Sequence, residues 1–165
     1  MARNFLTHSP EETIELGRLL ARELQPPVVV LLIGNLGAGK TTLAKGLVSG
    51  LGAAPEEEVT SPTFTLVHEY GPLGTAATRV YHVDLYRIET PGELITLGLE
   101  DMTAERAVVV VEWGEKLGSS FRNPWTGSRV LEIRMEAEGE TERRIEIVSL
   151  ESNSPADSPA SQTGA

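Results

Sequence analysis

The sequence lacks cysteine altogether and contains only three histidines, and these absences limit the chemistry that the chain can carry. Without cysteine, neither disulfide bonds nor thiolate metal sites can form. The histidines are too widely spaced to suggest a zinc site of their own: His8, His68 and His82. No apolar run approaches the ~20 residues that cross a bilayer, and the first residues lack the basic-then-apolar pattern of a signal peptide. We therefore expect a cytoplasmic protein that does not contact a membrane.

Basic residues are also scarce relative to acidic ones. The 165 residues include 14 Lys and Arg against 24 Asp and Glu, and the formal net charge is −10. Binding of nucleic acid depends on clustered basic side chains that neutralise phosphates. If nucleic acid takes part in the function, we expect a partner to hold it.

Length and composition predict one folded domain followed by a tail. An apolar content of 40% is ordinary for a globular chain, and residues 1–150 are expected to form the domain. Residues 151–165 read ESNSPADSPASQTGA, and their Ser, Pro and Ala content predicts a disordered tail. A tail that binds a partner is the alternative.

Strand-like and helix-like segments alternate through the domain. Ser9, Pro10 and Glu12 open the segment 9–25 with the signature of a capped helix. The valine-rich runs at 28–34 and 107–112 predict strands that are buried on both faces. The remaining predicted elements are helices at 40–52 and 90–100, half-buried strands at 63–70 and 79–87, and a hairpin of strands at 129–136 and 143–150. The pattern indicates an α/β fold with a mixed parallel/antiparallel sheet flanked by helices.

The stretch IGNLGAGKTT, residues 33–42, predicts a phosphate-binding loop. Its residues from Gly34 to Thr41 fit the pattern G-x-x-x-x-G-K-[ST] at every fixed position. Glycines let backbone N–H groups surround phosphate oxygens, Lys40 reaches the β- and γ-phosphates, and the Thr41 hydroxyl ligates Mg²⁺. The buried strand before it and the helix after it favour a nucleotide site over a glycine-rich turn. We expect a single P-loop NTPase-like domain with these nucleotide-binding residues: Gly34, Asn35, Leu36, Gly37, Ala38, Gly39, Lys40, Thr41 and Thr42.

Two acidic residues are candidates to complete this site near Mg²⁺. Glu112 ends the run AVVVV, and the carboxyl ends of parallel strands are where open α/β sheets place their sites. Asp84 lies in YHVDLYR, where alternation puts His82, Asp84 and Tyr86 on one face. The alternatives are a Glu that emerges into solvent and an Asp on the polar outer face of a strand. We interpret His82 as an orienting or structural residue, because no third metal ligand is evident.

The stretch TSPTFTL offers a second set of polar contacts. In a P-loop protein, a hydroxyl-rich loop between the first helix and the next strand is where a nucleotide-sensing segment lies. Ser61, Thr63 and Thr65 are therefore further candidates for nucleotide binding, and a capped turn that enters a strand is the alternative.

Taken together, these stretches closely resemble the bacterial TsaE family, also called YjeE. The resemblance is carried by GNLGAGKTT, SPTFTLVHEY, YHVDLYR and VVVVEWGE, in that order, and extends from about residue 13 to residue 136. Proteins of this family are small ATPases required for threonylcarbamoyl modification of the adenosine next to the anticodon in tRNA. They act with a two-subunit threonylcarbamoyl transferase (TsaB and TsaD type proteins), so tRNA is a partner only through the complex.

For this chain, the resemblance implies ATP and Mg²⁺ as cofactors, with the metal held by Thr41 and Glu112. It also implies catalytic roles for Lys40, Asp84 and Glu112, with the segment 61–65 around the γ-phosphate. The family usually has Asp where Asn35 stands and Pro where Gly114 stands; the latter difference bears on the position of Glu115.

Two other functions fit the same motifs. A small-molecule or nucleoside kinase would use Asp84 as the base for an acceptor hydroxyl, although no arginine-bearing lid is evident. A nucleotide-gated binding module would signal through its nucleotide state, with incidental hydrolysis. Because no arginine is clearly placed as a finger, we expect slow hydrolysis by the chain alone. The helix start at 9–13 is a candidate for contact with adenine.

Overall fold

The computed structural model of the protein describes residues 2–72, 78–117 and 129–150. The predicted tail lies outside these residues. The helices are α1 (Pro10–Ala21), α2 (Lys40–Gly50), α3 (Pro91–Thr96) and α4 (Leu99–Ala104), with the 3₁₀ turns η1 (Glu56–Glu58) and η2 (Gly114–Leu117). The strands are β1 (Ala2–Thr7), β2 (Val28–Ile33), β3 (Val67–Tyr70), β4 (Val80–Asp84), β5 (Val108–Glu112), β6 (Arg129–Ala137) and β7 (Arg143–Leu150). Within these ranges, no helix has the length and apolar character needed to span a membrane.

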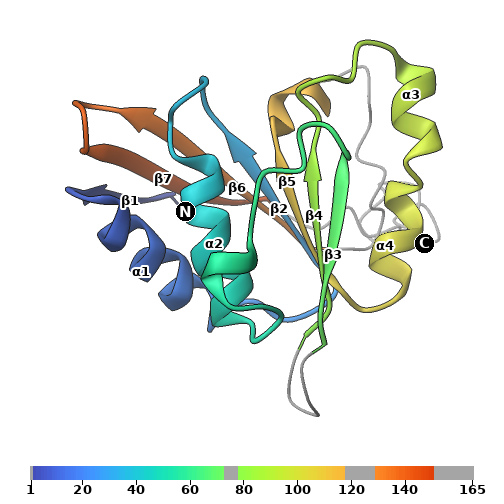
Figure 1. Cartoon of the computed structure of the whole chain (residues 1–165), viewed down its shortest axis with the longest axis horizontal. Coiled ribbons are helices and arrows are strands. Elements are labelled where there is room, and N and C mark those ends of the chain that lie inside the picture. The colour runs from blue at the N-terminus through green and yellow to red at the C-terminus, as the bar shows by residue number, and fades with distance from the viewer. Residues whose placement is uncertain (1, 73–77, 118–128, 151–165) are drawn as a thin grey trace, which may run out of the picture.

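The seven strands form one mixed sheet in the order β1-β7-β6-β2-β5-β4-β3 (Figure 1). Strands β6, β2, β5 and β4 run parallel to one another, while β3 pairs antiparallel with β4 at one side, and β7 and β1 extend the other side as antiparallel strands. This confirms the predicted mixed α/β fold. Because β2, β5 and β4 are parallel, their carboxyl ends meet at one edge of the sheet, where ligand sites of open α/β sheets lie.

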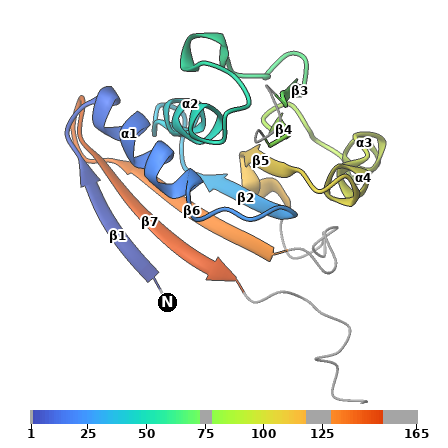
Figure 2. The same cartoon turned by 90° about the horizontal axis from the view of Figure 1, so that it is seen from below.

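Helices cover both faces of the sheet. Helices α1 and α2 lie side by side over one face, and α3 and α4 lie beside β4 and β5 (Figure 2). Alternate residues of the valine-rich strands therefore enter two different apolar clusters. Val28, Val30 and Leu32 of β2 belong to the cluster that contains residues of α1 and α2, whereas Val29 belongs to the cluster on the α3–α4 side.

Glycines allow α1 to pack against the backbone of α2. A Cβ atom at Gly46 would overlap the carbonyl oxygen of Ile14, and one at Gly17 would lie 2.7 Å from the carbonyl oxygen of Leu43. The predicted helix cap is also confirmed, since the Ser9 hydroxyl accepts a hydrogen bond from the Glu12 N–H at 3.1 Å. The start of α1 is therefore held firmly beside α2.

Four predictions about local structure were wrong or incomplete. Strand β1 was missed; it is an edge strand with little apolar periodicity, and it pairs with β7 from the far end of the sequence. Residues 63–66 form a turn instead of the first half of a strand. The strand β4 was expected to be half-buried, but all five of its residues are buried, because helices cover both faces of the sheet. The helix expected at 90–100 is two helices separated at Gly98, whose φ of +67° interrupts the helix.

Candidate nucleotide-binding site

A cavity of about 450 Å³ lies at the carboxyl edge of the parallel strands. This volume is in the range of small-molecule sites in proteins. Most of the residues predicted for the site line it. Its wall consists of Leu36, Gly37, Ala38, Gly39, Lys40, Thr41, Thr42, Ser61, Thr63, Asp84, Tyr86, Glu112, Trp113 and Arg143. The fold thus brings together segments that are far apart in the sequence.

The phosphate loop connects β2 directly to α2. Gly37 and Gly39 have φ angles of +82° and +97°, in the left-handed region that side chains disfavour, and Gly39 is the N-cap of α2. The loop therefore takes a path that needs glycine at these positions. The first N–H groups of α2 have no intrahelical acceptor and face the cavity end of the helix, which suits an anion.

Lys40 is nearly covered, with 5% of its surface exposed. Its ammonium group donates hydrogen bonds to the carbonyl oxygens of Gly34 and Asn35, the latter at 3.4 Å. The same nitrogen lies 3.4 Å from the centroid of the Trp113 ring. Burial lowers the pKa of Lys40 from its usual value near 10.5, while three nearby carboxylates act in the opposite direction. The ammonium is thus held inside the loop by two backbone carbonyl oxygens and an aromatic ring.

Thr41, Glu112 and His82 form a connected set of polar side chains. The Thr41 hydroxyl lies 2.9 Å and 3.2 Å from the two carboxylate oxygens of Glu112. Nε2 of the fully buried His82 lies 2.5 Å from Oε2 of the same carboxylate. Nδ1 of His82 has no hydrogen-bond partner among the described residues. The predicted orienting role of His82 therefore has a geometric basis, since its ring fixes one carboxylate oxygen.

Asp84 is tied to the hydroxyl-rich segment. Its Oδ2 accepts hydrogen bonds from Ser61 at 3.0 Å and Thr63 at 2.8 Å, and its Oδ1 accepts one from the Tyr86 N–H at 2.8 Å. Sheet register explains why this carboxylate is near the other acid, because Asp84 of β4 pairs directly with Glu112 of β5. The alternative of Asp84 on a polar outer face is wrong, since only 1% of the residue is exposed.

Three predicted binding residues do not line the cavity. Gly34 and Asn35 contact it indirectly, through the carbonyl oxygens that accept hydrogen bonds from Lys40. Thr65 is exposed and lies outside the wall of the cavity, because residues 63–66 turn away before β3 begins.

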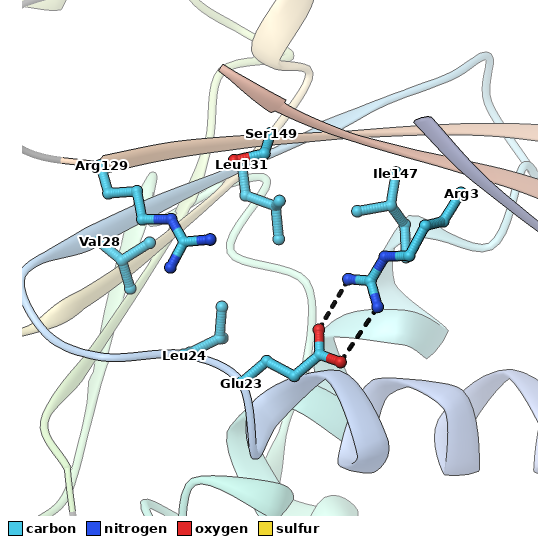
Figure 3. A pocket seen from close by; sticks show the side chains of 8 residues that line it. All are labelled: Arg3, Glu23, Leu24, Val28, Arg129, Leu131, Ile147 and Ser149. Atoms are coloured by element: carbon cyan, nitrogen blue, oxygen red, sulfur yellow. Dashed lines mark hydrogen bonds and ion pairs between the residues drawn. The ribbon is translucent and has the colours of Figure 1, made fainter. Parts of the chain in front are cut away.

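Figure 3 shows a second, smaller recess at the opposite end of β2. Val28 and Arg129, the first residues of β2 and β6, line it, whereas the phosphate loop follows the last residue of β2. Arg3 donates two hydrogen bonds to the Glu23 carboxylate, at 3.0 Å and 2.7 Å, which tie β1 to the chain beyond α1. Since none of the predicted site residues lines this recess, the larger cavity is the candidate site.

Comparisons with known proteins agree on one family. Residues 7–145 match the sequence model of "Threonylcarbamoyl adenosine biosynthesis protein TsaE". The chain belongs to the TsaE family. A relative from Nostoc sp., called tRNA threonylcarbamoyladenosine biosynthesis protein TsaE, is 38% identical over 151 residues, which are 89% of this chain and 85% of the relative. The protein of the same name from Bacillus subtilis is 35% identical over 144 residues, 87% of this chain and 84% of the relative.

A solved structure agrees with the sequence comparisons. The crystal structure of YdiB from Bacillus subtilis is similar to this chain with a TM-score of 0.68 and 31% sequence identity. The similarity covers 92% of this chain and 87% of YdiB. The fold predicted for a TsaE family member is therefore confirmed along nearly the whole chain.

The two departures from the usual TsaE pattern have different surroundings. The Asn35 side chain is exposed, and only the backbone of this residue contacts Lys40. Gly114 is buried at the start of η2, where a Cβ atom would lie 2.9 Å from the Cβ of Leu31. The chain after it places Glu115 against the phosphate loop, with Oε2 accepting a hydrogen bond from the Gly34 N–H at 3.1 Å.

Sequence reasoning missed three residues that line the cavity of this TsaE family member: Tyr86, Trp113 and Arg143. Tyr86 belongs to the DLYR motif, and its position two residues after Asp84 was the available signal. Arg143 lies at the start of β7, a strand predicted only as half of a hairpin. The strand order places β7 beside β6, and β6 beside β2, so only the three-dimensional fold brings Arg143 to the phosphate loop.

Proposed function

We propose that this protein is a Mg²⁺-dependent ATPase that supports threonylcarbamoyl modification of the adenosine next to the anticodon in tRNA. In this proposal it acts with a two-subunit threonylcarbamoyl transferase and binds tRNA only through that complex. Membership of the TsaE family supports the role in the modification, and the cavity supports the chemistry. The observation that carries the ATPase proposal is the Thr41 hydroxyl 2.9 Å from Glu112, beside Lys40 at the mouth of a P-loop.

The residues present fit a magnesium nucleotide. Thr41 and Glu112 supply a hydroxyl and a carboxylate, and Mg²⁺ prefers oxygen ligands. Among the described residues, no group of three or more His, Cys, Asp and Glu side chains could hold a metal ion alone. This suits Mg²⁺, which commonly takes one or two protein ligands and completes its shell with phosphate oxygens and water. When bound, the ion supplies positive charge that offsets charge developing on the phosphates.

The chain's own residues contribute binding and orientation. Lys40, released from the loop carbonyls, donates to the β- and γ-phosphate oxygens, and the N–H groups of the loop surround the same phosphates. His82 holds the Glu112 carboxylate in one orientation. In this proposal Asp84, with Ser61 and Thr63 bonded to it, orients a water molecule toward the terminal phosphate.

Asp84 is less suited to the alternative kinase chemistry. Three donors already occupy its oxygens: the hydroxyls of Ser61 and Thr63 and the N–H of Tyr86. These hydrogen bonds leave little of the carboxylate free to contact an acceptor hydroxyl. We therefore favour attack by water over transfer to an acceptor.

Hydrolysis by the chain alone is expected to be slow. P-loop proteins without a completed arginine-finger arrangement hydrolyse nucleotide at roughly 10⁻⁴ to 10⁻² per second. In this proposal the partner proteins raise the hydrolysis rate, either by completing the site or by speeding product release.

The test is ATP hydrolysis by the purified protein, alone and with the transferase pair, measured beside tRNA modification over many turnovers. We expect a slow basal rate, a higher rate with partners, and sustained modification. Lys40→Ala and Glu112→Ala should each end sustained modification. If both variants still support it, the ATPase proposal fails. A basal rate of tens per second would contradict partner dependence.

A further inference from the structure

The 3₁₀ turn η2 begins shortly after the acid Glu112, and the proposed mechanism uses none of its residues. Two of its side chains contact segments that line the nucleotide cavity. Glu115 accepts a hydrogen bond from the N–H of Gly34, the first residue of the phosphate loop. Lys116 donates hydrogen bonds to backbone oxygens of the segment that follows Asp84. The turn is therefore bonded to two separate parts of the proposed site.

The turn is anchored to the folded domain at both of its ends. Gly114, its first residue, is buried, and a Cβ atom there would lie 2.9 Å from the Cβ of Leu31 on β2. Leu117, its last residue, is buried in the apolar cluster on the α3–α4 side, which also contains residues of β4 and β5. Glu115 and Lys116 lie exposed between these two anchors. The backbone of the turn is thus fixed, and it sets where the two charged side chains reach.

Glu115 binds the phosphate loop at the point where the pairing of β2 with β5 ends. The last residue pair of these strands is Leu32 with Glu112. Past this pair, the Gly34 N–H meets a side chain instead of a strand, since Oε2 of Glu115 accepts its hydrogen bond at 3.1 Å. On the side of β6, a Cβ atom at Gly34 would lie 2.5 Å from the carbonyl oxygen of Met135. The start of the loop is therefore held between β6 and the Glu115 carboxylate.

The same glycine also contacts the lysine of the loop. The carbonyl oxygen of Gly34 accepts a hydrogen bond from the Lys40 ammonium, so Gly34 is bonded to Glu115 through its N–H and to Lys40 through its C=O. Burial lowers the pKa of Lys40, and Glu115 has the largest effect among the carboxylates that oppose this shift. Glu115 thus lies close to the lysine both in its bonding and in its electrostatic effect.

Lys116 connects the turn to the segment after Asp84. Its ammonium donates to the carbonyl oxygens of Tyr86 and Ile88, the latter at 3.1 Å, and lies 5.6 Å from the centroid of the Tyr86 ring. The N–H of Tyr86 in turn donates to Oδ1 of Asp84 at 2.8 Å. Lys116 therefore fixes the piece of backbone that holds the Asp84 carboxylate.

We propose that η2 positions both parts of the site: Glu115 fixes the start of the phosphate loop, and Lys116 fixes the segment that orients Asp84. This inference rests on the proposed ATPase function and deepens it. Neither side chain lines the cavity, so both are positioning residues that act through other groups. Loss of Glu115 loosens the backbone that surrounds the phosphates and should weaken nucleotide binding. Loss of Lys116 should instead slow hydrolysis, because Asp84 is proposed to orient water.

Two substitutions of Glu115 separate its hydrogen bond from its charge. Glu115→Ala removes the acceptor, whereas Glu115→Gln keeps an oxygen in the same place and removes only the charge. We expect Glu115→Ala to bind ATP about tenfold more weakly in calorimetry, and Glu115→Gln to restore the affinity to within about threefold of the parent. Without nucleotide, NMR should show faster hydrogen exchange of the Gly34 amide in Glu115→Ala only. Glu57→Ala is the matched control, since Glu57 is exposed in the 3₁₀ turn η1 and does not line the cavity.

Lys116→Met tests the other side of the turn, because it keeps the aliphatic part of the side chain and removes the ammonium. We expect single-turnover hydrolysis of ATP to be about tenfold slower, with ATP affinity within about threefold of the parent. A general disturbance of the turn would change affinity and rate together. Thermal unfolding of each variant shows that the domain stays folded.

The possible results distinguish this inference from the proposed function. If a folded Glu115→Ala protein binds ATP like the parent, or if Glu115→Gln is equally impaired, the role of Glu115 is overturned. If Lys116→Met hydrolyses ATP at the parent rate, or loses as much affinity as Glu115→Ala, the role of Lys116 is overturned. A parent protein that neither binds nor hydrolyses ATP would refute the proposed function itself, and the exchange of the Gly34 amide would still test its contact with Glu115.

Discussion

The Lys40 ammonium lies 3.4 Å from the centroid of the Trp113 ring, at the point where β5 leaves the sheet. Trp113 follows the acid Glu112 directly and has a φ of +61°, which is unfavourable for a bulky side chain. The ring also packs against Tyr86, with centroids 5.1 Å apart. The Lys40 side chain, which is proposed to bind phosphate, is therefore held against an aromatic ring whose own backbone is strained. Binding of a nucleotide has to draw the ammonium away from this ring.

Trp113 fluorescence should report this withdrawal. The chain has two tryptophans, and Trp125→Phe leaves Trp113 as the only one. Because a cation near the indole ring changes its emission, we expect ATP to change the spectrum of this variant with the same midpoint as calorimetric binding. A Trp113→Phe protein that keeps Trp125 is the control and should show little change. Constant emission from Trp113 at saturating ATP would mean that the ammonium stays on the ring.

His82→Gln should lower hydrolysis more than it lowers binding. The substitution removes the ring that fixes one Glu112 oxygen, and loss of a residue that orients a metal ligand typically costs about 10–100-fold in activity. Affinity for ATP without Mg²⁺ should change less than about threefold. His68→Gln is the control, since the His68 ring lies outside the cavity wall and shares a 3.3 Å hydrogen bond with Tyr70. Equal activity of the two variants would contradict an orienting role for His82.

The three hydroxyls of the segment 61–65 should separate into two groups. Ser61 and Thr63 bond to Asp84, whereas Thr65 lies outside the cavity. We expect Ser61→Ala and Thr63→Ala each to slow ATP hydrolysis by about tenfold, since each removes a bond of roughly 1–2 kcal/mol from the carboxylate that orients water. Thr65→Ala should stay within about twofold of the parent. A similar loss in all three variants, measured as single-turnover rates, would argue for a general effect on the segment.

The lowered pKa of Lys40 predicts how stability depends on pH. Burial lowers this pKa, so the unfolded chain binds the Lys40 proton more tightly than the folded protein does. Stability should therefore rise with pH between the lowered pKa and the usual value near 10.5. Lys40→Met lacks this titration. Thermal melting without nucleotide from pH 8 to 10 should show the parent gaining stability relative to the variant, and an opposite trend would refute the assignment.

Gly46→Ala tests the contact between α1 and α2. The added methyl group overlaps the Ile14 carbonyl oxygen, and overpacking of this kind costs about 1–3 kcal/mol. A domain of this size should then melt about 2–4 °C lower for each kcal/mol lost. Gly92→Ala in α3 is the matched control, because no atom lies within 4 Å of its added Cβ. That variant should melt within a few degrees of the parent or slightly higher.

Local sequence patterns predicted those parts of the fold that depend on residues near one another in the sequence. The valine-rich runs of β2 and β5, the helix α2 after the glycine-rich loop and the Ser9 cap each carry their signal within a few residues, and the structure confirms each. Strand β1 was missed because its partner β7 lies at the far end of the chain, where Ala2 pairs with Val148. Burial on both faces of β4 was missed for a similar reason, since the alternation of residue types along a strand does not show which helices cover its two faces.

The same distinction applies to which residues of the candidate site could be predicted. Lys40, Thr41, Asp84 and Glu112 were found because each lies in a motif with its own chemistry, and the structure brings all of them to one cavity. Their catalytic and metal-binding roles remain predictions. Arg143 has no motif of its own, because it reaches the phosphate loop only through the pairing of β7 with β6 and of β6 with β2. A sequence pattern read along the chain does not contain that information.

The sheet register makes the position of Glu112 depend on the length of the hydrophobic run before it. Glu112 stands opposite Leu32 of β2 on one side and Asp84 of β4 on the other. Four valines, Val108 to Val111, precede it in β5. Removing one valine would leave the strand equally apolar, but it would move Glu112 to the opposite face, away from Thr41. The number of valines, and not their hydrophobicity alone, therefore specifies where the acid meets the phosphate loop.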